Sequence, residues 1–244
     1  RRHENALLVL RTEHERVLAA HHDLAHIATH DAMTGLLNRG GFMTRLEQTL
    51  DAAASTPPRP IAVLFMDIDR FKSINDSLGH GAGDQLLQVM GRRITAVLPD
   101  GCTTGRLGGD EFVVVMDDAT NIDRVVAIAE RLARSIGEPL ELAGRLVRVS
   151  ASVGIAIGPE IDDTPSSIVG FANAALHRAK DSGRDRIEVF TPAVRADMQR
   201  RASEERALRR SIDAGDVVPF FQPEFDATTG RLVGVEVLAR WLKK

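Results

Sequence analysis

Two adjacent acids, Asp110 and Glu111, follow a pair of glycines in the middle of the chain. The polar segment 103–106 precedes the glycines and the apolar run 112–116 follows the acids, which predicts a tight hairpin with both carboxylates at its tip. A turn needs no more than one such acid for its own geometry. Two acids beside two glycines therefore indicate that the turn holds a cation, and the alternative is a solvated surface turn.

A second acidic element ends the apolar run 60–66, which has the length and continuous hydrophobicity of a strand buried on both faces. The run stops at the sequence Asp67-Ile68-Asp69. Ligands of α/β folds collect where strands end. Two strand-end acids and two hairpin acids would together supply the oxygen ligands that hard divalent cations prefer.

Separated motifs between Asp31 and Phe190 occur in the order of a known family. They are DAMTGLLNR at 31–39, DIDRFKSIND at 67–76, GHGAGD at 79–84, GGDEF at 108–112 and ANAALHRAKDSGR at 172–184. With these motifs the chain resembles the GGDEF family of diguanylate cyclases. It departs from the family's closing motif at Asn173, His177 and Asp185, where the family has Asp, Tyr and Asn, and this affects local packing more than chemistry.

The resemblance implies that two GTP molecules are condensed into cyclic di-GMP, each ribose 3′-hydroxyl attacking the α-phosphate of the other nucleotide and pyrophosphate leaving. It implies that Asp67, the backbone carbonyl of Ile68 and Asp110 bind Mg²⁺ or Mn²⁺, and that Asp110 or Glu111 helps to deprotonate the hydroxyl. Lys72 would act with them on the triphosphate. Because one domain holds one GTP, we expect an antiparallel homodimer with the reaction at its interface. The substrate contacts that the resemblance implies are Phe71, Lys72, Asn75, His80, Asp84, Gly108, Gly109, Lys180 and Arg184.

Some of these residues also have a bottom-up reason or a plainer explanation. Lys72 lies in the first turn of a short helix after Asp69, where a positive side chain opposes the helix dipole. A triphosphate near the first helix amides would explain it, and a solvated lysine is the alternative. An amide beside a carboxylate can read the guanine edge, which favours Asn75 and Asp84. Without the resemblance, Asn75 would be a helix C-cap and Asp84 the N-cap of a helix over 85–98.

Two motifs have structural explanations as well. Capping rules alone account for Lys180 at a helix end and for Gly183 after it. Thr34 and Asn38 serve to cap and turn the chain, and we interpret the segment 31–39 as structural.

Two other functions compete with the cyclase. The first is a regulatory module that binds GTP without turning it over and controls an adjoining EAL phosphodiesterase domain. The loss of a signature acid or glycine usually marks such a module, and none is lost here. The second is a different nucleotide cyclase or a polymerase-like palm, which shares the strand-end acids.

Composition narrows the class of protein. The 244 residues are 43% hydrophobic and 27% charged, as in ordinary globular proteins. The net charge of −3 indicates no nucleic-acid partner, and a single cysteine excludes an internal disulfide. We see no apolar stretch of about 20 residues that could span a membrane. We expect a cytoplasmic location and, because the chain starts at Arg1, a segment of a longer protein whose membrane anchor would lie outside it.

The predicted elements are arranged as strand, helix, hairpin, helix, strand, helix, strand. This order predicts an α/β (α+β) fold with a ferredoxin-like βαββαβ core and a central, mostly antiparallel sheet, as in nucleotide cyclases and polymerase palms. Besides the first strand and the hairpin, the main predicted elements are helices over 40–53, 121–136 and 164–182 and strands over 147–157 and 186–190. The small residues of 147–157 predict a close approach by helices.

We predict four parts along the chain. They are a long N-terminal signalling helix over 1–29 with coiled-coil spacing, the GGDEF domain over 30–191, a linker helix over 192–215 and a fragment over 216–244. The alternative for the first part is a single amphipathic helix lying on the domain. The last part resembles the start of an EAL domain, with Glu236-Val237-Leu238 in place of Glu-Ala-Leu. Only a first hairpin of that domain is present, so we expect no phosphodiesterase activity from this fragment.

Overall fold

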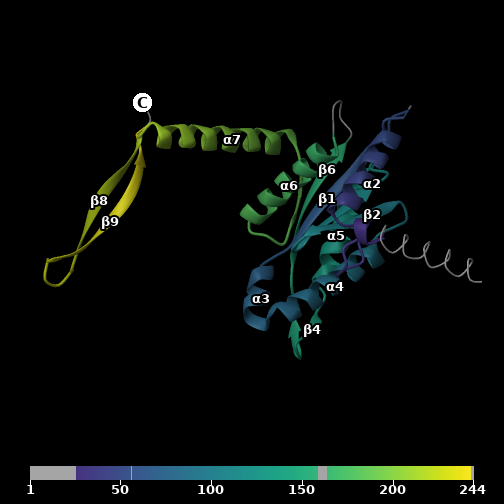
Figure 1. Cartoon of the computed structure of the whole chain (residues 1–244), viewed down its shortest axis with the longest axis horizontal. Coiled ribbons are helices and arrows are strands. Elements are labelled where there is room, and N and C mark those ends of the chain that lie inside the picture. The colour runs from purple at the N-terminus through teal and green to yellow at the C-terminus, as the bar shows by residue number, and fades with distance from the viewer. Residues whose placement is uncertain (1–25, 56, 159–163, 243–244) are drawn as a thin grey trace, which may run out of the picture. The chain divides into compact units, whose positions relative to one another are not determined.

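The computed structural model describes residues 26–55, 57–158 and 164–242 (Figure 1). The helix predicted over 1–29 lies outside the described residues except for its last turn, 26–29, which is helical. The coiled-coil prediction therefore also falls outside them. The chain divides into two compact units, Arg1–Val194 and Arg195–Lys244, which are described separately below.

A five-stranded sheet forms the centre of the first unit, in the order β2-β3-β1-β6-β7. Neighbouring strands are antiparallel except β6 and β7, which are parallel. This confirms the predicted α/β fold with a mostly antiparallel central sheet. The strands are β1 (Ile61–Ile68), β2 (Cys102–Gly108), β3 (Glu111–Met116), β6 (Ala151–Gly158) and β7 (Ile187–Val189).

Strand β1 is buried on both faces, and its side chains alternate between two hydrophobic cores. Its odd-numbered residues from 61 to 65 pack with helices α2 and α6, and its even-numbered residues pack with α4 and α5 (Figure 1). Asp67 continues the odd-numbered series, so its carboxylate lies on the α6 side of the sheet. The helices of this unit are α2 (Arg39–Ala53), α3 (Phe71–Leu78), α4 (His80–Val97), α5 (Ile122–Ile136) and α6 (Pro165–Asp181).

Side-chain caps start three of the helices. Asn38 accepts from the Gly41 amide at α2, Asn121 caps α5, and Thr164 forms a capping box at α6. The capping alternative for Asn75 and Asp84 does not hold. Gly79, with φ of 86°, ends α3, and α4 already begins at His80, so Asn75 lies inside one helix and Asp84 inside the next.

The strand predicted over 147–157 is two strands. The small hairpin of β4 (Leu140–Leu142) and β5 (Arg145–Val147) ends before β6 begins at Ala151. Residues 148–150 lie between them, and the Asp69 amide donates to the Ser150 carbonyl at 2.9 Å, in register with the pairing of Ile68 and Ala151.

Gly154 lets helix α6 approach the sheet closely, as the small residues of this strand predicted. A Cβ at this position would overlap the backbone of Ala172 and Leu176 in α6. Rigid backbone cannot yield as a flexible side chain does, so we expect Gly154→Ala to lower the free energy of unfolding by about 3 kcal/mol or more. The midpoint of urea unfolding measures this effect.

Gly170 provides the matched control, because a Cβ added there would meet no atom within 4 Å. It lies inside α6, where alanine is favoured over glycine, so Gly170→Ala should raise stability by about 0.5–1 kcal/mol. Equal effects of the two substitutions would show that the close approach at Gly154 is not what limits this position.

The second unit contains most of helix α7 (Pro192–Asp213) and a hairpin of β8 (Val217–Phe225) and β9 (Leu232–Trp241). The helix predicted over 192–215 is present as α7, which ends at Asp213. The hairpin exposes many of its large apolar side chains, among them Phe221 at 67% and Val237 at 61%. Among the helices that the structure describes, none is long and apolar enough to cross a membrane.

Candidate active site

The acidic hairpin tip lies beside the end of β1. Strands β2 and β3 are joined by Gly109 and Asp110, and both Gly108 and Gly109 have positive φ, at 144° and 52°. In the register of β1 and β3, Asp67 is the direct partner of Glu111. The antiparallel pairing thus brings the strand-end acid Asp67 and the two hairpin acids to one edge of the sheet.

A lysine from α6 completes this cluster. The Lys180 ammonium lies 2.7 Å from Asp67 Oδ2, and the two side chains are only 25% and 12% exposed. Asp67 faces α6 because of its place in the β1 alternation, so the register of the strand and the end of the helix together make this ion pair. The guanidinium of Arg39 reaches Glu111 only at 3.9 Å, and both side chains are largely solvated.

Asp110 is electrostatically unfavourable as an anion in this cluster. Its partial burial and then the charge of Asp67 raise the pKa of its carboxyl above the ordinary aspartate value, although Lys180 acts in the opposite direction. The cluster has three carboxylates, Asp67, Asp110 and Glu111, and one lysine. A bound cation would therefore reduce the repulsion between the carboxylates.

The raised pKa of Asp110 has a consequence for stability. A carboxyl whose pKa is higher in the folded state costs stability above that pKa, and the cost vanishes below the unfolded value of about 3.9. We therefore expect Asp110→Asn to make the metal-free protein more stable at neutral pH, with the gain shrinking as the pH falls through the folded pKa. Urea unfolding at several pH values measures it, with the exposed Asp100→Asn as the control. A loss of stability at neutral pH would contradict this account.

Asp69 does not join the acidic cluster, which corrects the idea that all four acids form one site. Its side chain is only 7% exposed. The Ser150 hydroxyl donates to Asp69 Oδ2 at 2.6 Å, the Ser152 hydroxyl to Oδ1 at 2.7 Å, and the Asp185 amide to Oδ2 at 3.1 Å. Both oxygens are therefore engaged in holding β1, β6 and the turn after α6 together.

Arg106 holds the turn between β2 and β3, and the sequence motifs assign it no role. Its Nη1 donates to both carboxylate oxygens of Asp31 at 3.0 Å, while Nε and Nη2 donate to the Gly109 carbonyl at 2.9 and 2.7 Å. Burial alone would raise the pKa of Asp31, but hydrogen bonds from Thr34 and Arg106 hold it below the usual value. The contacts of the segment 31–39 agree with its structural interpretation, because its acid Asp31 holds the glycine turn at 108–109 through Arg106.

A second group of predicted residues lies between α3 and α4. The side-chain oxygen of Asn75 is buried and has no hydrogen-bond partner among the described residues. It sits directly over Gly83, where a Cβ would overlap it, and Phe71 is also close to this glycine. Asp84 follows Gly83 and is exposed. An unsatisfied buried amide oxygen beside an exposed carboxylate is a suitable pair of groups for a ligand with polar edges.

The remaining predicted residues are placed around these two groups. Lys72 is exposed in the first turn of α3 and His80 is exposed at the start of α4. Arg184 follows α6 in a left-handed conformation, with φ of 66°, and its amide donates to the Ala179 carbonyl at 3.0 Å. The structure thus brings together Asp67, Asp110, Glu111 and Lys180, and separately Phe71, Asn75 and Asp84.

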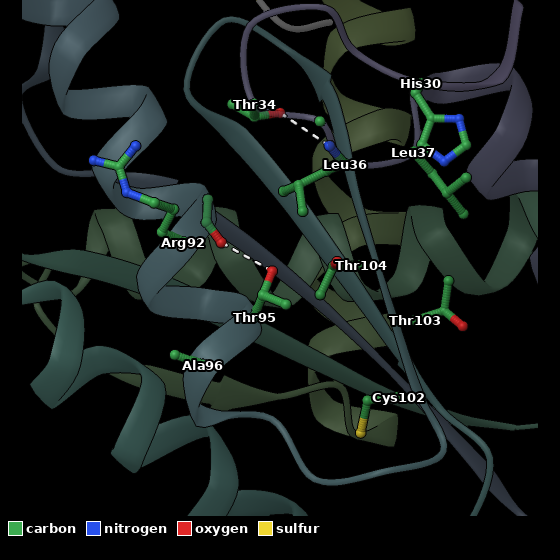
Figure 2. Close-up of a pocket in the computed structure, with 12 residues that line it drawn as sticks. His30, Thr34, Leu36, Leu37, Arg92, Thr95, Ala96, Cys102, Thr103 and Thr104 are labelled. Carbon is green, nitrogen blue, oxygen red and sulfur yellow. Dashed lines mark hydrogen bonds between the residues drawn. The ribbon is translucent and has the colours of Figure 1, made fainter. Parts of the chain in front are cut away.

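A cavity of about 620 Å³ lies behind the turn that Asp31 anchors, between that turn, α4 and the start of β2 (Figure 2). The Thr34 hydroxyl accepts from the Leu36 amide and the Thr95 hydroxyl donates to the Gly91 carbonyl along its wall. No residue predicted to bind metal or substrate lines it. It is therefore separate from the acidic cluster.

Comparison with known proteins identifies the class. The chain matches the family described as diguanylate cyclase, GGDEF domain, over residues 28–186. The match spans more than half of the chain, so the chain belongs to the GGDEF family. Solved structures and curated sequences show which individual proteins the chain resembles.

Two solved structures share this fold. The GGDEF domain of TpbB, or YfiN, from Pseudomonas aeruginosa is 37% identical, with a TM-score of 0.66 over 70% of this chain and 99% of that chain. The coiled coil and GGDEF domain of DgcB from Caulobacter crescentus, in complex with c-di-GMP, is 26% identical, with a TM-score of 0.69 over 76% of this chain and 98% of that one.

Curated relatives are much longer. An uncharacterized protein of Mycobacterium tuberculosis is 37% identical over 240 residues, which is 97% of this chain and 38% of the relative. The bifunctional diguanylate cyclase/cyclic di-GMP phosphodiesterase MucR of Pseudomonas aeruginosa is 38% identical over 222 residues, 91% of this chain and 32% of MucR. The chain thus spans about a third of the length of these relatives.

Proposed function

We propose that this domain is an active diguanylate cyclase that condenses two GTP molecules into cyclic di-GMP and two pyrophosphates. The observation that carries the proposal is the convergence of Asp67, Asp110 and Lys180 at the glycine hairpin. Family membership and the complete signature sequence support it. A related structure, DgcB, was solved with c-di-GMP.

The acidic cluster fits a divalent cation such as Mg²⁺ or Mn²⁺. Asp67, the carbonyl of Ile68 and Asp110 would hold it, and when bound it would neutralise charge on the phosphate oxygens. The described residues contain no group of three or more His, Cys, Asp or Glu side chains arranged for a metal. Two carboxylates and one carbonyl suit Mg²⁺, which usually keeps waters and binds substrate phosphates as well.

Residues of the chain would also neutralise the charge of the triphosphate and accept the proton of the attacking hydroxyl. Lys180, Lys72 and Arg184 would offset the charge of the triphosphate. Asp110, or its neighbour Glu111, would accept the proton of the 3′-hydroxyl. Because each domain would hold one GTP, the active species would be a homodimer in which two such sites face each other.

Asn75 on α3 and Asp84 on α4 would select guanine. Asn75 offers a side-chain oxygen that lies over Gly83 and has no partner among the described residues, and Asp84, which follows Gly83, offers an exposed carboxylate. Guanine presents N–H donors on the edge that such acceptors read, whereas adenine leaves them unsatisfied. We expect Asn75→Ala to weaken GTP binding about tenfold or more while leaving the weak binding of ATP unchanged.

Calorimetric titration with each nucleotide measures this selectivity. The control is Ser77→Ala on the same helix, because its hydroxyl donates only to backbone carbonyls of α3. Equal loss of GTP and ATP binding in Asn75→Ala would mean that the residue supports the fold of the pocket and not the choice of base.

The regulatory module remains the competing function. In that case the domain would bind GTP without converting it and would act on an adjoining EAL domain. The deciding experiment incubates the chain with GTP and Mg²⁺, at protein concentrations that force dimers, and separates the nucleotides. Cyclic di-GMP formation supports the cyclase. GTP bound but unconverted would favour the regulatory module.

We further propose that the segment 216–244 begins an EAL domain, with 192–215 as a linker helix after a GGDEF domain over 30–191. The exposed apolar side chains of β8 and β9 support this, because an isolated hairpin needs a packing partner to be stable. MucR, a longer relative whose name carries both a diguanylate cyclase and a cyclic di-GMP phosphodiesterase activity, supports the pairing of these two domains in one protein. Limited proteolysis of a longer chain should protect this hairpin and cut within α7.

A further inference from the structure

A cavity of about 430 Å³ lies between α3, the segment 148–150 and the turn 183–185 after α6. Helix α3 lines it with the face that carries Arg70 and Ser73. Neither Lys72 nor Asn75, the substrate residues predicted on this helix, is among its lining residues, and neither are the acids of the hairpin. The cavity is thus distinct from the cluster of Asp67, Asp110 and Lys180.

Three arginines from three different segments line this cavity: Arg70, Arg148 and Arg184. Within the described part of the chain, no carboxylate lies within ion-pair distance of any of their guanidinium groups. Three guanidinium groups around one space repel one another unless an anion lies between them. Guanidinium groups also match the geometry of phosphate oxygens, to which they donate in pairs.

The two acids that line the cavity do not remove this positive character. Asp69 has both oxygens engaged by Ser150, Ser152 and the Asp185 amide, so it offers the arginines no free acceptor although it keeps its negative charge. Three arginines against two acids, Asp69 and Asp185, leave the lining with an excess of one positive charge.

The backbone around the cavity is held in an unusual conformation. Arg70, Arg184 and Asp185 have positive φ, at 59°, 66° and 49°, and the only other such non-glycine residue among those described is Ala143. Left-handed conformations of ordinary residues persist where the surroundings determine them, and they concentrate at ligand sites. All three of these residues, Arg70, Arg184 and Asp185, line the cavity.

We propose that this cavity binds a small phosphate-bearing anion, at a site separate from that of the substrate metal. The Ser73 hydroxyl adds a polar group to the three guanidinium groups on its wall. Arg184 belongs both to this cavity and to the predicted triphosphate contacts. Occupancy of the cavity would draw Arg184 away from GTP, so a phosphate-bearing ligand here would act as an inhibitor. The binding itself does not depend on the proposed cyclase activity.

The test is calorimetric titration of the whole chain with inorganic phosphate and with pyrophosphate, in metal-free buffer of low ionic strength. Arg148→Gln should weaken binding of the anion about tenfold or more, because it removes a charged donor but leaves the predicted substrate contacts intact. Arg145→Gln, an exposed arginine on β5 outside the cavity, is the matched control and should bind as the parent does. Whichever anion binds more tightly identifies the number of phosphates that the site takes.

Absence of binding by either anion, or equal loss in Arg145→Gln and Arg148→Gln, would overturn the proposal. GTP titrations of the same variants separate the two sites. Unchanged GTP affinity in Arg148→Gln supports a distinct site, whereas equal loss of GTP and phosphate would assign the cavity to the substrate and overturn its independence. Asp110→Ala should leave phosphate binding unchanged, so the failure of the cyclase proposal would be recognised separately.

Discussion

Replacement of Asp110 by alanine should abolish formation of cyclic di-GMP from GTP, with a loss of at least about 100-fold. The substitution removes one of two carboxylates proposed to hold the cation and also one of the two candidate proton acceptors. Residues that only orient metal ligands already cost about 10–100-fold when mutated, so a ligand itself should cost more. Product separation after incubation with GTP and Mg²⁺ measures the loss.

The control for this experiment is Asp100→Ala, which removes an exposed aspartate from the loop before β2. It should leave both turnover and unfolding unchanged. The folded state of Asp110→Ala can be verified by urea unfolding, and we expect it to be at least as stable as the parent at neutral pH, because its raised pKa makes Asp110 unfavourable there. Retained activity in Asp110→Ala would exclude this residue as the metal acid.

Replacement of Arg106 by alanine should have the largest combined effect on stability and turnover. It leaves the partly buried Asp31 without its partner and the Gly109 carbonyl without its two donors. Breaking such a buried pair costs about 3 kcal/mol of unfolding free energy. A shift of the hairpin by about 1 Å would lower turnover about 100-fold further.

A double-mutant cycle with Asp31→Ala separates these causes. If the two residues act through their ion pair, the double variant should lose much less stability than the sum of the single variants. The pKa of Asp31 is lowered in the fold, so its contribution is present above an unfolded pKa of about 3.9 and is lost as the pH falls through the folded pKa. Additive losses at neutral pH would show that Arg106 acts without Asp31. The surface pair of Arg124 and Asp118 offers a control with little expected coupling.

Much of the fold followed from local patterns in the sequence. The continuous apolar run of β1, the glycines of the hairpin and the helix predicted over 121–136 are examples, because each is encoded within one short segment. The acids Asp67 and Asp110 were predicted to meet because strand ends and hairpin tips gather ligands, and the register of β1 and β3 does bring them to one edge. Boundaries were less accurate. Helix α4 starts at His80, directly after the positive φ of Gly79, and the strand predicted from residue 147 starts only at Ala151.

Only the tertiary structure separated the roles of Asp67 and Asp69. Asp67 lies near the end of β1 and Asp69 directly after it, and the sequence pattern does not distinguish them. Yet one contacts Lys180 and the other is engaged by Ser150 and Ser152, 81 and 83 positions away. The clamp of Arg106 on Asp31 likewise joins residues 75 positions apart. No local period encodes such partners. These partners are brought together only when the strands pair and the chain turns after β1. The sequence by itself therefore determined which chemical groups are present, and the packing decided which of them remain available for a ligand.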